Sequence, residues 1–540
     1  MMVNNLCKSY GDKDLLINIS FNLHEENKVG LVGKNASGKS TLLKILSGLV
    51  DADSGKVNLN GKTIKLLKQE IEKKYDNYSV TDYIKHDNGI LELETKLHEL
   101  ESNLTDDNME EYGEVLESFL KINGYDFDTN LEMIVNGLNM NIDLDKKIKT
   151  LSGGQKIKVL LASVLLSNAD ILLLDEPTNN LDIEAIEWLE NYLKKINKEV
   201  IIVSHDEVFL NSTTNKIFEL ENGNLTEYNM SYTDYLTYKE HQYNRELEKY
   251  EQAKEQQKKI KASIQEAKEW ANKGLSKKKS DNDKLSANFS KERTKKTSSK
   301  ASKLTKELEK VEIDKSFRKK EKIDFSVDFS DSKGNRDIYI TDLVCGCDTF
   351  KTPKINLDIP FGTRLNISGN NGSGKTTFIR TLLGEIEPLN GKIYIGNDVK
   401  IGYIAQDTLD SEYSDYSIYE YLSKDTEIDK SMLFNILTKF HINYSEKDKA
   451  YSTLSPGQRT RVNLAKLAIN EINTLILDEA TNHLDMEALN VLKEVIESFN
   501  GTIISVSHNR SYNKFLNSDM NLDIQTGTIS YSDTVNKKIK

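Results

Sequence analysis

The sequence predicts an α/β protein made of two tandem copies of one domain, joined by a long α-helical hairpin. Three observations carry this prediction. The chain has 540 residues, which is too long for a single hydrophobic core. Five short segments recur in the same order in its two halves, which indicates a duplication. Between the halves, apolar residues recur at steps of three and four in a charged segment, a pattern typical of a long helix.

The five repeated segments define the domain boundaries. Their matched positions are Gly33 and Gly369, Gln69 and Gln406, Leu151 and Leu454, Asp175 and Asp478, and His205 and His508. The last three pairs are 303 residues apart, whereas the first two are 336 and 337 apart, so the first copy carries 34 extra residues. We expect a first domain at residues 1–232, a linker at 233–322 and a second domain at 323–540.

The extra residues of the first copy fall at about residues 85–121. Leucines recur there with roughly helical spacing, and Asp106-Asp107-Asn108 supplies a turn. The segment has 11 acidic and 3 basic residues. We predict a short, acidic helical hairpin, called the arm below.

The linker is predicted to be an antiparallel helical hairpin with its tip near Trp270–Leu285. A seam of apolar residues from Tyr243 to Ala267 continues on the return at Leu304 and Leu308. A solvated, partly disordered connector is the alternative. Residues 237–322 have a net charge of +11 in a chain of net charge -12, so the linker is suited to a phosphate-rich partner. The tip residues singled out are Trp270, Leu275, Lys277, Lys278, Lys279 and Phe289, whose aromatic and apolar members could either stack on nucleotides or close the hairpin.

Composition and the first residues limit the location of the protein. Three cysteines cannot form a disulfide framework, and the start of the chain lacks the features of a secretory signal. No run reaches the roughly 18 to 20 apolar residues needed to cross a bilayer. We therefore expect a cytoplasmic protein with no membrane domain of its own.

Each copy contains a glycine-rich loop that follows an apolar strand and opens a predicted helix. Such a loop closes backbone N–H groups around phosphates at a helix N-terminus. Lys39 and Lys375 would contact the phosphates of ATP, and Ser40 and Thr376 would ligate Mg²⁺. The predicted ATP-binding residues of the two loops are Gly33, Asn35, Gly38, Lys39, Ser40 and Thr41, and Gly369, Asn371, Gly372, Gly374, Lys375, Thr376 and Thr377.

Two further repeated segments supply candidate catalytic groups. Asp175 and Asp478 end apolar strands and would hold Mg²⁺, while the adjacent Glu176 and Glu479 would act as general bases on the attacking water. His205 and His508 follow strands and could contact the γ-phosphate. A lone histidine is more often structural, but the Ser-His pair in both copies favours a functional role.

Together these motifs resemble the ABC ATPase superfamily, including its LSGGQ signature, which other P-loop ATPases lack. The resemblance implies that the signature of one domain faces the ATP of the other, so that Ser152 faces Lys375 and Ser455 faces Lys39. It assigns Gln69 and Gln406 to Mg²⁺, and Tyr10 and Phe350 to stacking on adenine. The signature residues implied are Ser152, Gly153, Gly154 and Gln155, and Ser455, Gly457 and Gln458.

Two fused domains, an arm and a long charged linker resemble the ABC-F family, in particular its antibiotic-resistance branch. This resemblance implies a monomer, with its two domains paired within the chain, that binds the E site of the 70S ribosome. The linker would then contact 23S rRNA and P-site tRNA, and the displaced drugs would be pleuromutilins, lincosamides or streptogramin A. A housekeeping ABC-F translation factor acting on stalled ribosomes is the alternative, and the ATPase subunit of a drug exporter is a more distant one.

The sequence departs from the family pattern at several positions. Pro456 replaces a signature glycine and removes one backbone donor, which would weaken the site of Lys39. Ala480 stands where a proline is usual, and Glu207 stands where an arginine is usual. Asn509 replaces an aspartate in the second copy. The two ATP sites are therefore expected to be unequal.

Overall fold

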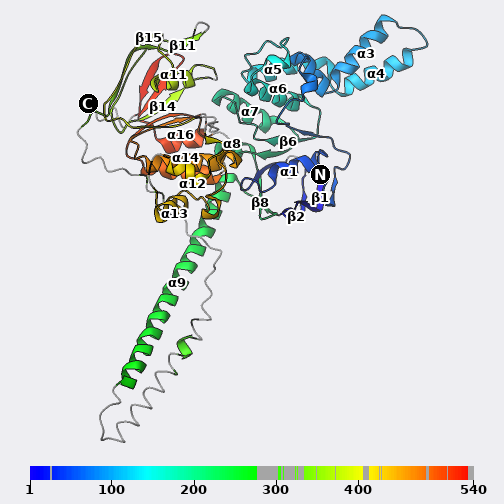
Figure 1. The fold of residues 1–540 in the computed structure, drawn as a ribbon. Helices are drawn as coiled ribbons and strands as arrows, with labels where there is room; N and C mark the ends of the chain where they lie inside the picture. Colours follow the sequence, from blue (N-terminus) through cyan, green and yellow to red (C-terminus); the bar gives the residue numbers. More distant parts are fainter. Residues whose placement is uncertain are drawn as a thin grey trace, which may run out of the picture. The chain divides into compact units, whose positions relative to one another are not determined.

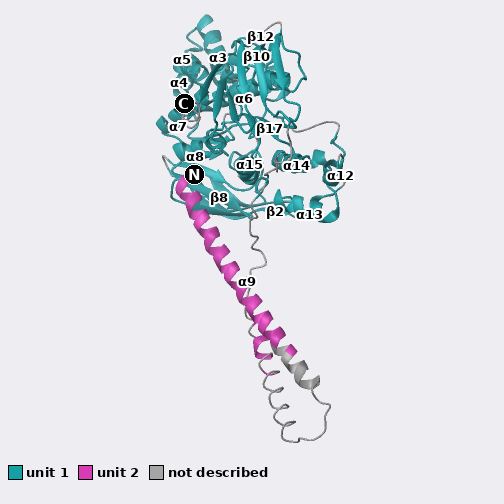
Figure 2. Ribbon diagram, turned by 90° about the vertical axis from the view of Figure 1, so that its left-hand side faces the viewer, with its two compact units in different colours: residues 1–232, 322–540 teal, residues 233–321 magenta. Residues whose placement is uncertain are grey.

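The computed structural model describes two compact units, which are coloured separately in Figure 2. One unit comprises Met1–Tyr232 and Lys322–Lys540, and the other is Thr233–Glu321. The structure describes the chain except for residues 12, 25–26, 277–298, 300–301, 306–307, 309–322, 324, 326–333, 348–349, 371, 406–412, 425, 427, 482–483, 485, 508 and 533–540. The predicted site residues Lys277, Lys278, Lys279, Phe289, Asn371, Gln406 and His508 therefore lie outside the described residues, as do the side chains of Trp270 and Leu275.

The first domain, which contains β6 and β8 as labelled in Figure 1, is built on a six-stranded sheet in the order β5-β6-β7-β3-β8-β9. Neighbouring strands are parallel, except that β8 and β9 are antiparallel. The central strands β6 and β7 are apolar except for Asp175 and Glu199 at their ends, because helices and a second sheet bury both of their faces. The strands are β3 (Lys28–Val32), β5 (Ile64–Leu66), β6 (Ile171–Asp175), β7 (Glu199–Val203), β8 (Lys216–Glu221) and β9 (Asn224–Tyr228).

A smaller antiparallel sheet, in the order β2-β1-β4, covers one face of this domain. Alternate residues of its strands, such as Val3 and Leu16, join Leu42 and Leu43 of α1 in one core with the central sheet. These elements are β1 (Met2–Tyr10), β2 (Lys13–Asn22), β4 (Ser54–Asn58) and α1 (Lys39–Leu46).

The remaining helices of the first domain, except α5, begin at side-chain caps. Ser152 caps α6 with a capping box, Asp182 caps α7 and Asp206 caps α8. All three caps belong to predicted functional segments or follow them closely. The hydrogen bonds of the caps therefore hold these segments at the N-termini of their helices. The helices are α2 (Val80–Asp87), α5 (Phe127–Gly137), α6 (Gly153–Leu166), α7 (Ile183–Lys195) and α8 (Glu207–Thr213).

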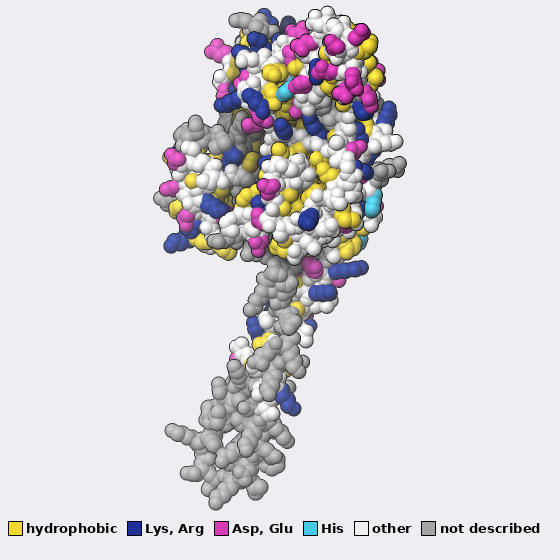
Figure 3. All heavy atoms as spheres, turned by 90° about the vertical axis from the view of Figure 1, so that its right-hand side faces the viewer, with side chains coloured by type: hydrophobic (Ala, Val, Ile, Leu, Met, Phe, Trp, Pro, Cys, Tyr) yellow, Lys and Arg dark blue, Asp and Glu magenta, His cyan; other side chains and the backbone are white. Residues whose placement is uncertain are grey.

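The arm is a pair of helices, α3 (Ile90–Ser102) and α4 (Met109–Lys121). It starts at Ile90 rather than near residue 85, because α2 continues to Asp87 and Gly89 turns the chain with a φ of 70°. Leu97 and Phe119 are buried, one on each helix. Figure 3 shows Asp and Glu side chains gathered over this end of the unit, as the composition predicts.

The second domain repeats the first. Its six-stranded sheet has the order β16-β17-β18-β14-β19-β20, and its antiparallel sheet has the order β13-β10-β15. Leu475 and Leu477 of β17 point to the helical core, whereas Ile476 between them points to the core under the antiparallel sheet. The strands are β10 (Ile338–Val344), β11 (Gly346–Cys347), β12 (Phe350–Lys351), β13 (Ile355–Ile359), β14 (Arg364–Ser368), β15 (Asn390–Ile395), β16 (Ile401–Ile404), β17 (Thr474–Asp478), β18 (Thr502–Val506), β19 (Met520–Asp523) and β20 (Thr528–Tyr531).

The helices of the second domain match those of the first, without the arm. Ser455 caps α14 with the same capping box that Ser152 forms on α6. The helices are α11 (Lys375–Leu382), α12 (Ile418–Ser423), α13 (Lys430–Lys439), α14 (Pro456–Ile469), α15 (Met486–Ser498) and α16 (Arg510–Leu516). The two-domain α/β prediction, with a helical insert between the copies, is confirmed.

The linker unit contains one long helix, α9 (Tyr232–Ser276), of 45 residues. At 1.5 Å per residue such a helix is about 68 Å long. Ile260 and Ile264, two members of the predicted apolar seam, are each only 8% exposed. On the return, residues 302–305 are helical, and the predicted tip is described only as far as Ser276. Within the described part of the chain, no helix has both the length and the apolar character that crossing a membrane requires.

Candidate nucleotide-binding sites

The two glycine-rich loops have the same geometry. The Nζ of Lys39 donates to the backbone oxygens of Gly33 at 2.7 Å and Lys34 at 3.1 Å. The Nζ of Lys375 donates to the corresponding oxygens of Gly369 at 2.8 Å and Asn370 at 3.1 Å. Both lysines are almost fully buried. Each ammonium group thus lies inside its own loop, where a phosphate would meet it.

Both loops require glycine where the chain leaves the strand. Gly33 has a φ of 155°, and a side-chain carbon there would lie 2.3 Å from the backbone oxygen of Leu220. Gly369 has a φ of 146°, and such a carbon would lie 2.6 Å from Ile524. Neither position can carry a larger residue without moving the loop.

Two serines in the loops fit a phosphate ligand. Ser37 and Ser373 occupy equivalent positions, and the Oγ of each is buried without a hydrogen-bond partner. A buried hydroxyl without a partner is costly, so each loop has room for an acceptor to be supplied by a ligand. The sequence analysis did not single out these serines, although both lie within the glycine-rich pattern.

The two predicted general bases share an unusual backbone conformation. Glu176 follows Asp175 at the end of β6 with a φ of 52°, and Glu479 follows Asp478 at the end of β17 with a φ of 48°. Left-handed backbone is costly for residues other than glycine and is found mostly at functional sites. The backbone N–H of Glu176 donates to Val203 at 2.8 Å and holds this turn in place.

Glu176 and His205 lie side by side, with Oε1 and Nε2 3.4 Å apart. Burial, followed by the nearby Asp175, raises the pKa of Glu176 to about 8. Burial, followed by the Lys39 ammonium, lowers the pKa of His205 to about 4. His205 is therefore neutral at pH 7. Glu176 can exchange a proton near neutral pH, which is the property a general base needs.

The second site has a carboxylate suited to a cation. Asp478 is fully buried, and neither of its oxygens makes a hydrogen bond of good geometry, although the Thr376 and Tyr403 hydroxyls lie near it. Burial raises the pKa of Asp478, and Thr376 and Lys375 oppose this shift. A buried carboxylate beside a threonine hydroxyl fits the Mg²⁺ ligands of a P-loop. Within the described residues no cluster of three or more His, Cys, Asp or Glu side chains forms a metal site.

The two signature segments keep the same local structure despite Pro456. The N–H of Gln155 donates to Ser152 Oγ at 3.3 Å, and the N–H of Gln458 donates to Ser455 Oγ at 3.3 Å. Pro456 is the first residue of α14, a position whose N–H has no partner within the helix. The proline therefore removes one donor without disturbing the helix.

A cavity of about 510 Å³ is formed by both domains. The first domain contributes its signature, and the second contributes its glycine-rich loop. Burial lowers the pKa of Lys375, an effect opposed by Glu479 and Asp478 and also by Asp182 of the first domain. The predicted site residues that line the cavity are Ser152, Gly154, Gln155, Glu176, His205, Phe350, Gly372, Gly374, Lys375, Thr376, Thr377 and Glu479.

A second cavity, of about 470 Å³, is lined by residues of the first domain, and the predicted partners Ser455, Gly457 and Gln458 are not among its lining residues. Only one of the two expected signature pairings is thus brought together in this structure. The predicted residues that line this cavity are Tyr10, Asn35, Gly38, Lys39, Ser40, Thr41, Gln69, Asp175, Glu176 and His205.

The two predicted adenine-stacking residues are placed differently. The Phe350 ring lies against Gly374, where a side-chain carbon would be 2.6 Å away. At the equivalent Gly38 the neighbour is Leu15, and Tyr10 is 55% exposed at the end of β1. Tyr10 lines its cavity but is not the counterpart of Phe350 in the other copy.

A family model described as "ABC transporter" matches residues 16–179 and 353–482. These two segments include both glycine-rich loops, both signatures and both strand-end carboxylates. The chain belongs to the ABC transporter family of ATP-binding proteins. In this family the matched region is the ATP-binding domain, present here twice.

Individual relatives of this ABC protein extend over nearly the whole chain. An uncharacterized ABC transporter ATP-binding protein of Bacillus subtilis, YfmM, is 32% identical, covering 94% of this chain and 95% of the relative. ABC transporter F family member 2 of Arabidopsis thaliana is 30% identical, covering 95% of this chain and 74% of the relative. The chain is therefore related to the F family of ABC proteins.

A solved structure shares the fold. It is the archaeal ribosome recycling factor aABCE1 in complex with the archaeal ribosomal stalk protein aP1, with a TM-score of 0.60 and 20% identity. The match covers 97% of this chain and 89% of that chain. At this identity the likeness shows the fold of two ABC domains in tandem.

The ABC cavity also contains residues that the sequence analysis did not single out. Asn139 and Asn141 follow α5, and Thr178 to Asp182 closely follow Glu176. Asp182 both caps α7 and lies 3.9 Å from the buried Lys158. The second group has the sequence TNNLD, which recurs as TNHLD in the second copy, whereas nothing in the sequence marks the first group.

Proposed function

We propose that this protein is a Mg²⁺-dependent ATPase of the ABC-F type that acts on the 70S ribosome and protects it from antibiotics of the peptidyl-transferase centre. The observation that carries the ATPase proposal is the cavity in which Ser152 of one domain and Lys375 of the other line the same space. Because both domains contribute residues to this cavity, ATP bound there would contact both domains and would lose part of its contacts when they separate. ATP binding can therefore drive a conformational change of the whole chain.

The residues of the site have distinct roles in this proposal. Lys39 and Lys375 bind phosphate oxygens, and the N-termini of α1 and α11 add backbone donors. Mg²⁺, when bound, would neutralise phosphate charge, with Ser40 and Asp175 or Thr376 and Asp478 as its protein ligands. Gln69 and Gln406 would complete these ligand sets. Glu176 and Glu479 take the proton of the attacking water, and ATP is hydrolysed to ADP and phosphate. His205 and His508 orient the γ-phosphate.

A ribosomal target is supported by the linker and by relatives. The linker carries a net charge of +11 on residues 237–322, which suits a partner rich in phosphate. The solved structure of similar fold is a ribosome recycling factor bound to a ribosomal stalk protein. We propose binding at the ribosomal E site, with the linker contacting 23S rRNA and P-site tRNA. Such a target places the protein in the cytoplasm as a monomer.

Antibiotic protection is the finer part of the proposal. The 45-residue α9 gives the linker the length expected of the resistance branch. The drugs displaced would be pleuromutilins, lincosamides or streptogramin A. A housekeeping translation factor on stalled ribosomes is the second candidate, favoured by relatives whose names carry no resistance function.

Removing the two general bases tests the proposal. Glu176→Gln with Glu479→Gln should keep ATP binding, lower turnover by about 100-fold or more, and leave the protein bound to ribosomes. Co-sedimentation with 70S ribosomes in ATP is the measurement. Glu132→Gln with Glu387→Gln, two exposed positions outside the sites, is the control. Failure of the double variant to sediment more than wild type would reject ribosome trapping by ATP.

A further inference from the structure

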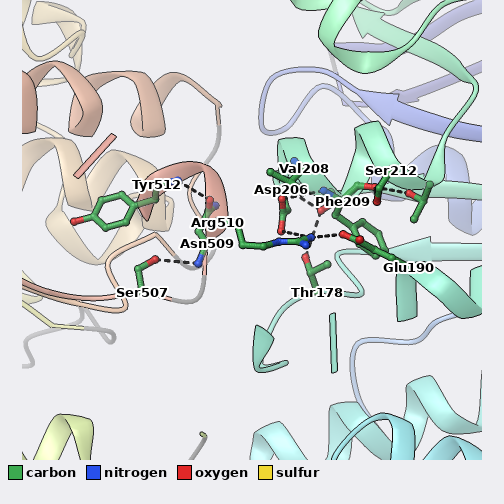
Figure 4. Close-up of polar contacts among 12 residues, drawn as sticks. Thr178, Glu190, Asp206, Val208, Phe209, Ser212, Ser507, Asn509, Arg510 and Tyr512 are labelled. Atoms are coloured by element: carbon green, nitrogen blue, oxygen red, sulfur yellow. Dashed lines mark hydrogen bonds and ion pairs between the residues drawn. The ribbon is translucent and has the colours of Figure 1, made fainter. Parts of the chain in front are cut away.

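Arg510 of the second domain forms an ion pair with the first domain (Figure 4). It is the first residue of α16, and one of its guanidinium nitrogens donates to Oε1 of Glu190 on α7. The same nitrogen lies 3.9 Å from Oδ2 of Asp206. The side chains are 19% exposed for Arg510, 10% for Glu190 and 6% for Asp206. Ion pairs withdrawn from water to this extent are screened little by salt.

Asp206 connects this pair to the ATP site. It follows His205, and its Oδ1 accepts from the N–H groups of Val208 at 2.9 Å and Phe209 at 3.0 Å. Oδ2 therefore remains for Arg510. Burial raises the pKa of Asp206, and the Arg510 guanidinium is among the groups that oppose this shift. Asp206 also lines the shared cavity together with Asn509 of the second domain.

The duplication also places an acidic and a basic residue near each other at the matching positions, on α8 (Glu207–Thr213) and α15 (Met486–Ser498). The counterpart of Arg510, 303 residues earlier, is Glu207, and the counterpart of Glu190 is Lys493. Burial raises the pKa of Glu207, and Lys493 opposes this shift. Lys493 also lies 4.2 Å from the Phe515 ring centroid. At both places an acid of the first domain is attracted by a base of the second, and at Arg510 the two groups form an ion pair.

The charges at these positions are opposite in the two copies. The matched pairs, first domain before second, are Glu190 and Lys493, Asp206 and Asn509, Glu207 and Arg510, and Asn211 and Lys514. The four positions sum to a charge of -3 in the first domain and +3 in the second. Two first domains meeting in the same way would place Glu190 against Glu207. Like charges brought together in a partly buried contact are strongly unfavourable.

We propose that these residues form a charge-complementary interface that makes the second domain of the same chain the partner of the first, and excludes a like copy from another chain. The interface borders the shared cavity, so it also favours the closed arrangement of that ATP site. The inference rests on the ATP-dependent pairing proposed above, but not on any ribosomal role.

Charge reversal and charge exchange test the interface. Arg510→Glu places a third acid beside Glu190 and Asp206, and should raise the ATP concentration for half-maximal compaction of the chain by about tenfold. Glu190→Arg combined with Arg510→Glu restores opposite charges, and should bring this concentration back to within about threefold of wild type. Small-angle X-ray scattering during titration with ATP and Mg²⁺ measures compaction without requiring hydrolysis. The maximal turnover should change less than the ATP concentration needed to reach it.

Controls separate the charge effect from a folding defect. Lys430→Glu makes the same change of charge at an exposed position of α13, and should leave the titration unchanged. Arg510→Met keeps an apolar stem without the charge, and should give an intermediate increase even if the reversal fails to fold. The exchange Glu207→Lys with Lys493→Glu repeats the test at the matching positions. Folded exchange variants that remain as impaired as their single reversals overturn the proposal. Compaction of wild type without turnover would instead reject the proposed hydrolysis and leave the interface standing.

Discussion

At the scale of single residues, the two general-base candidates combine backbone strain with partial burial. Glu176 and Glu479 both occupy the left-handed region of backbone conformation directly after a buried strand. In each copy the N–H of this glutamate donates to the backbone oxygen of Val203 or Val506, at the end of the strand before the repeated Ser-His pair. Glutamate is not favoured in this conformation by its local sequence preference. Its occurrence at the same place in both copies indicates that each turn holds the carboxylate in a required position.

The raised pKa of Glu176 predicts a pH dependence of stability. Its folded-state pKa of about 8 lies above the ordinary value of 4.5, so the folded protein binds this proton more tightly than the unfolded chain. The resulting stabilisation is fully present below about pH 4.5 and is lost as the pH rises through 8. Glu176→Gln removes this loss. As the pH rises from 5 to 9, the unfolding free energy of the variant should therefore increase by roughly 2 to 4 kcal/mol relative to that of wild type.

Urea unfolding followed through the fluorescence of Trp188, in the first domain, measures this difference. Glu132→Gln is the control, because this exposed glutamate of α5 should show no such trend. An unfolding free-energy difference between Glu176→Gln and wild type that does not change with pH would contradict the buried, proton-binding carboxyl.

At the scale of elements, helix packing in the first domain depends on a glycine. Gly137 ends α5 opposite Trp188 of α7, and a side-chain carbon at this position would lie 1.9 Å from the indole. Trp188 in turn stacks on Tyr192 with ring centroids 5.2 Å apart. Because α5 leads into the Asn139–Asn141 wall of the shared cavity, this packing also sets one side of the ATP site.

Gly137→Ala should therefore destabilise the first domain by about 2 kcal/mol or more, since the rigid indole cannot yield without shifting α7. Gly113→Ala is the matched control on α4, where nothing lies within 4 Å of the added carbon. There the same substitution should stabilise the arm by roughly 0.5 to 1 kcal/mol, because alanine loses less backbone freedom on folding. Hydrogen exchange of α5, α7 and α4 measures both effects. Equal changes at the two glycines would show that the Trp188 contact does not govern the packing.

At the scale of the whole molecule, charge is distributed unevenly among the linker, the arm and the two domains. The linker is basic, the arm is acidic, and the facing surfaces of the two domains carry opposite charges at the interface of Arg510. An acidic surface is repelled by phosphates, whereas a basic segment is attracted to them. This charge distribution is what the proposed ribosomal role requires, with the linker as the element that would approach RNA.

Shortening the tip separates these two activities. Deletion of Lys273–Asp283 with a glycine-rich closure should preserve ATP hydrolysis and ribosome co-sedimentation but abolish protection of translation from antibiotics. The physical reason is reach, because the tip is the part of the linker farthest along the chain from both ATP sites. In-vitro translation with a drug panel is the measurement. A deletion variant that still protects against every drug countered by the intact protein would reduce the linker to a connector.

Several features of the fold and the ATP sites could be predicted from the sequence alone. The duplication, both phosphate loops, the strand-end carboxylates and the helical arm all depend on short-range patterns. Glycines with positive φ, a helix cap such as Ser152 and the apolar period of a buried strand act over a few residues. Such local rules leave their mark directly in the order of amino acids.

Only the tertiary structure decided which residues meet across the two domains. The family resemblance implied both signature pairings, but the structure places only Ser152 and Lys375 in one cavity, leaves Ser455 out of the lining of the other, and puts Leu15, not Tyr10, opposite Gly38. It also joined Arg510 to Glu190, 320 residues earlier in the chain. Such contacts depend on how whole domains pack, and the free energy of an ion pair depends on burial that no local pattern encodes. The opposite charges can be read from the sequence. Only the structure shows that α7 and α16 face each other, so that these charges attract across the two domains.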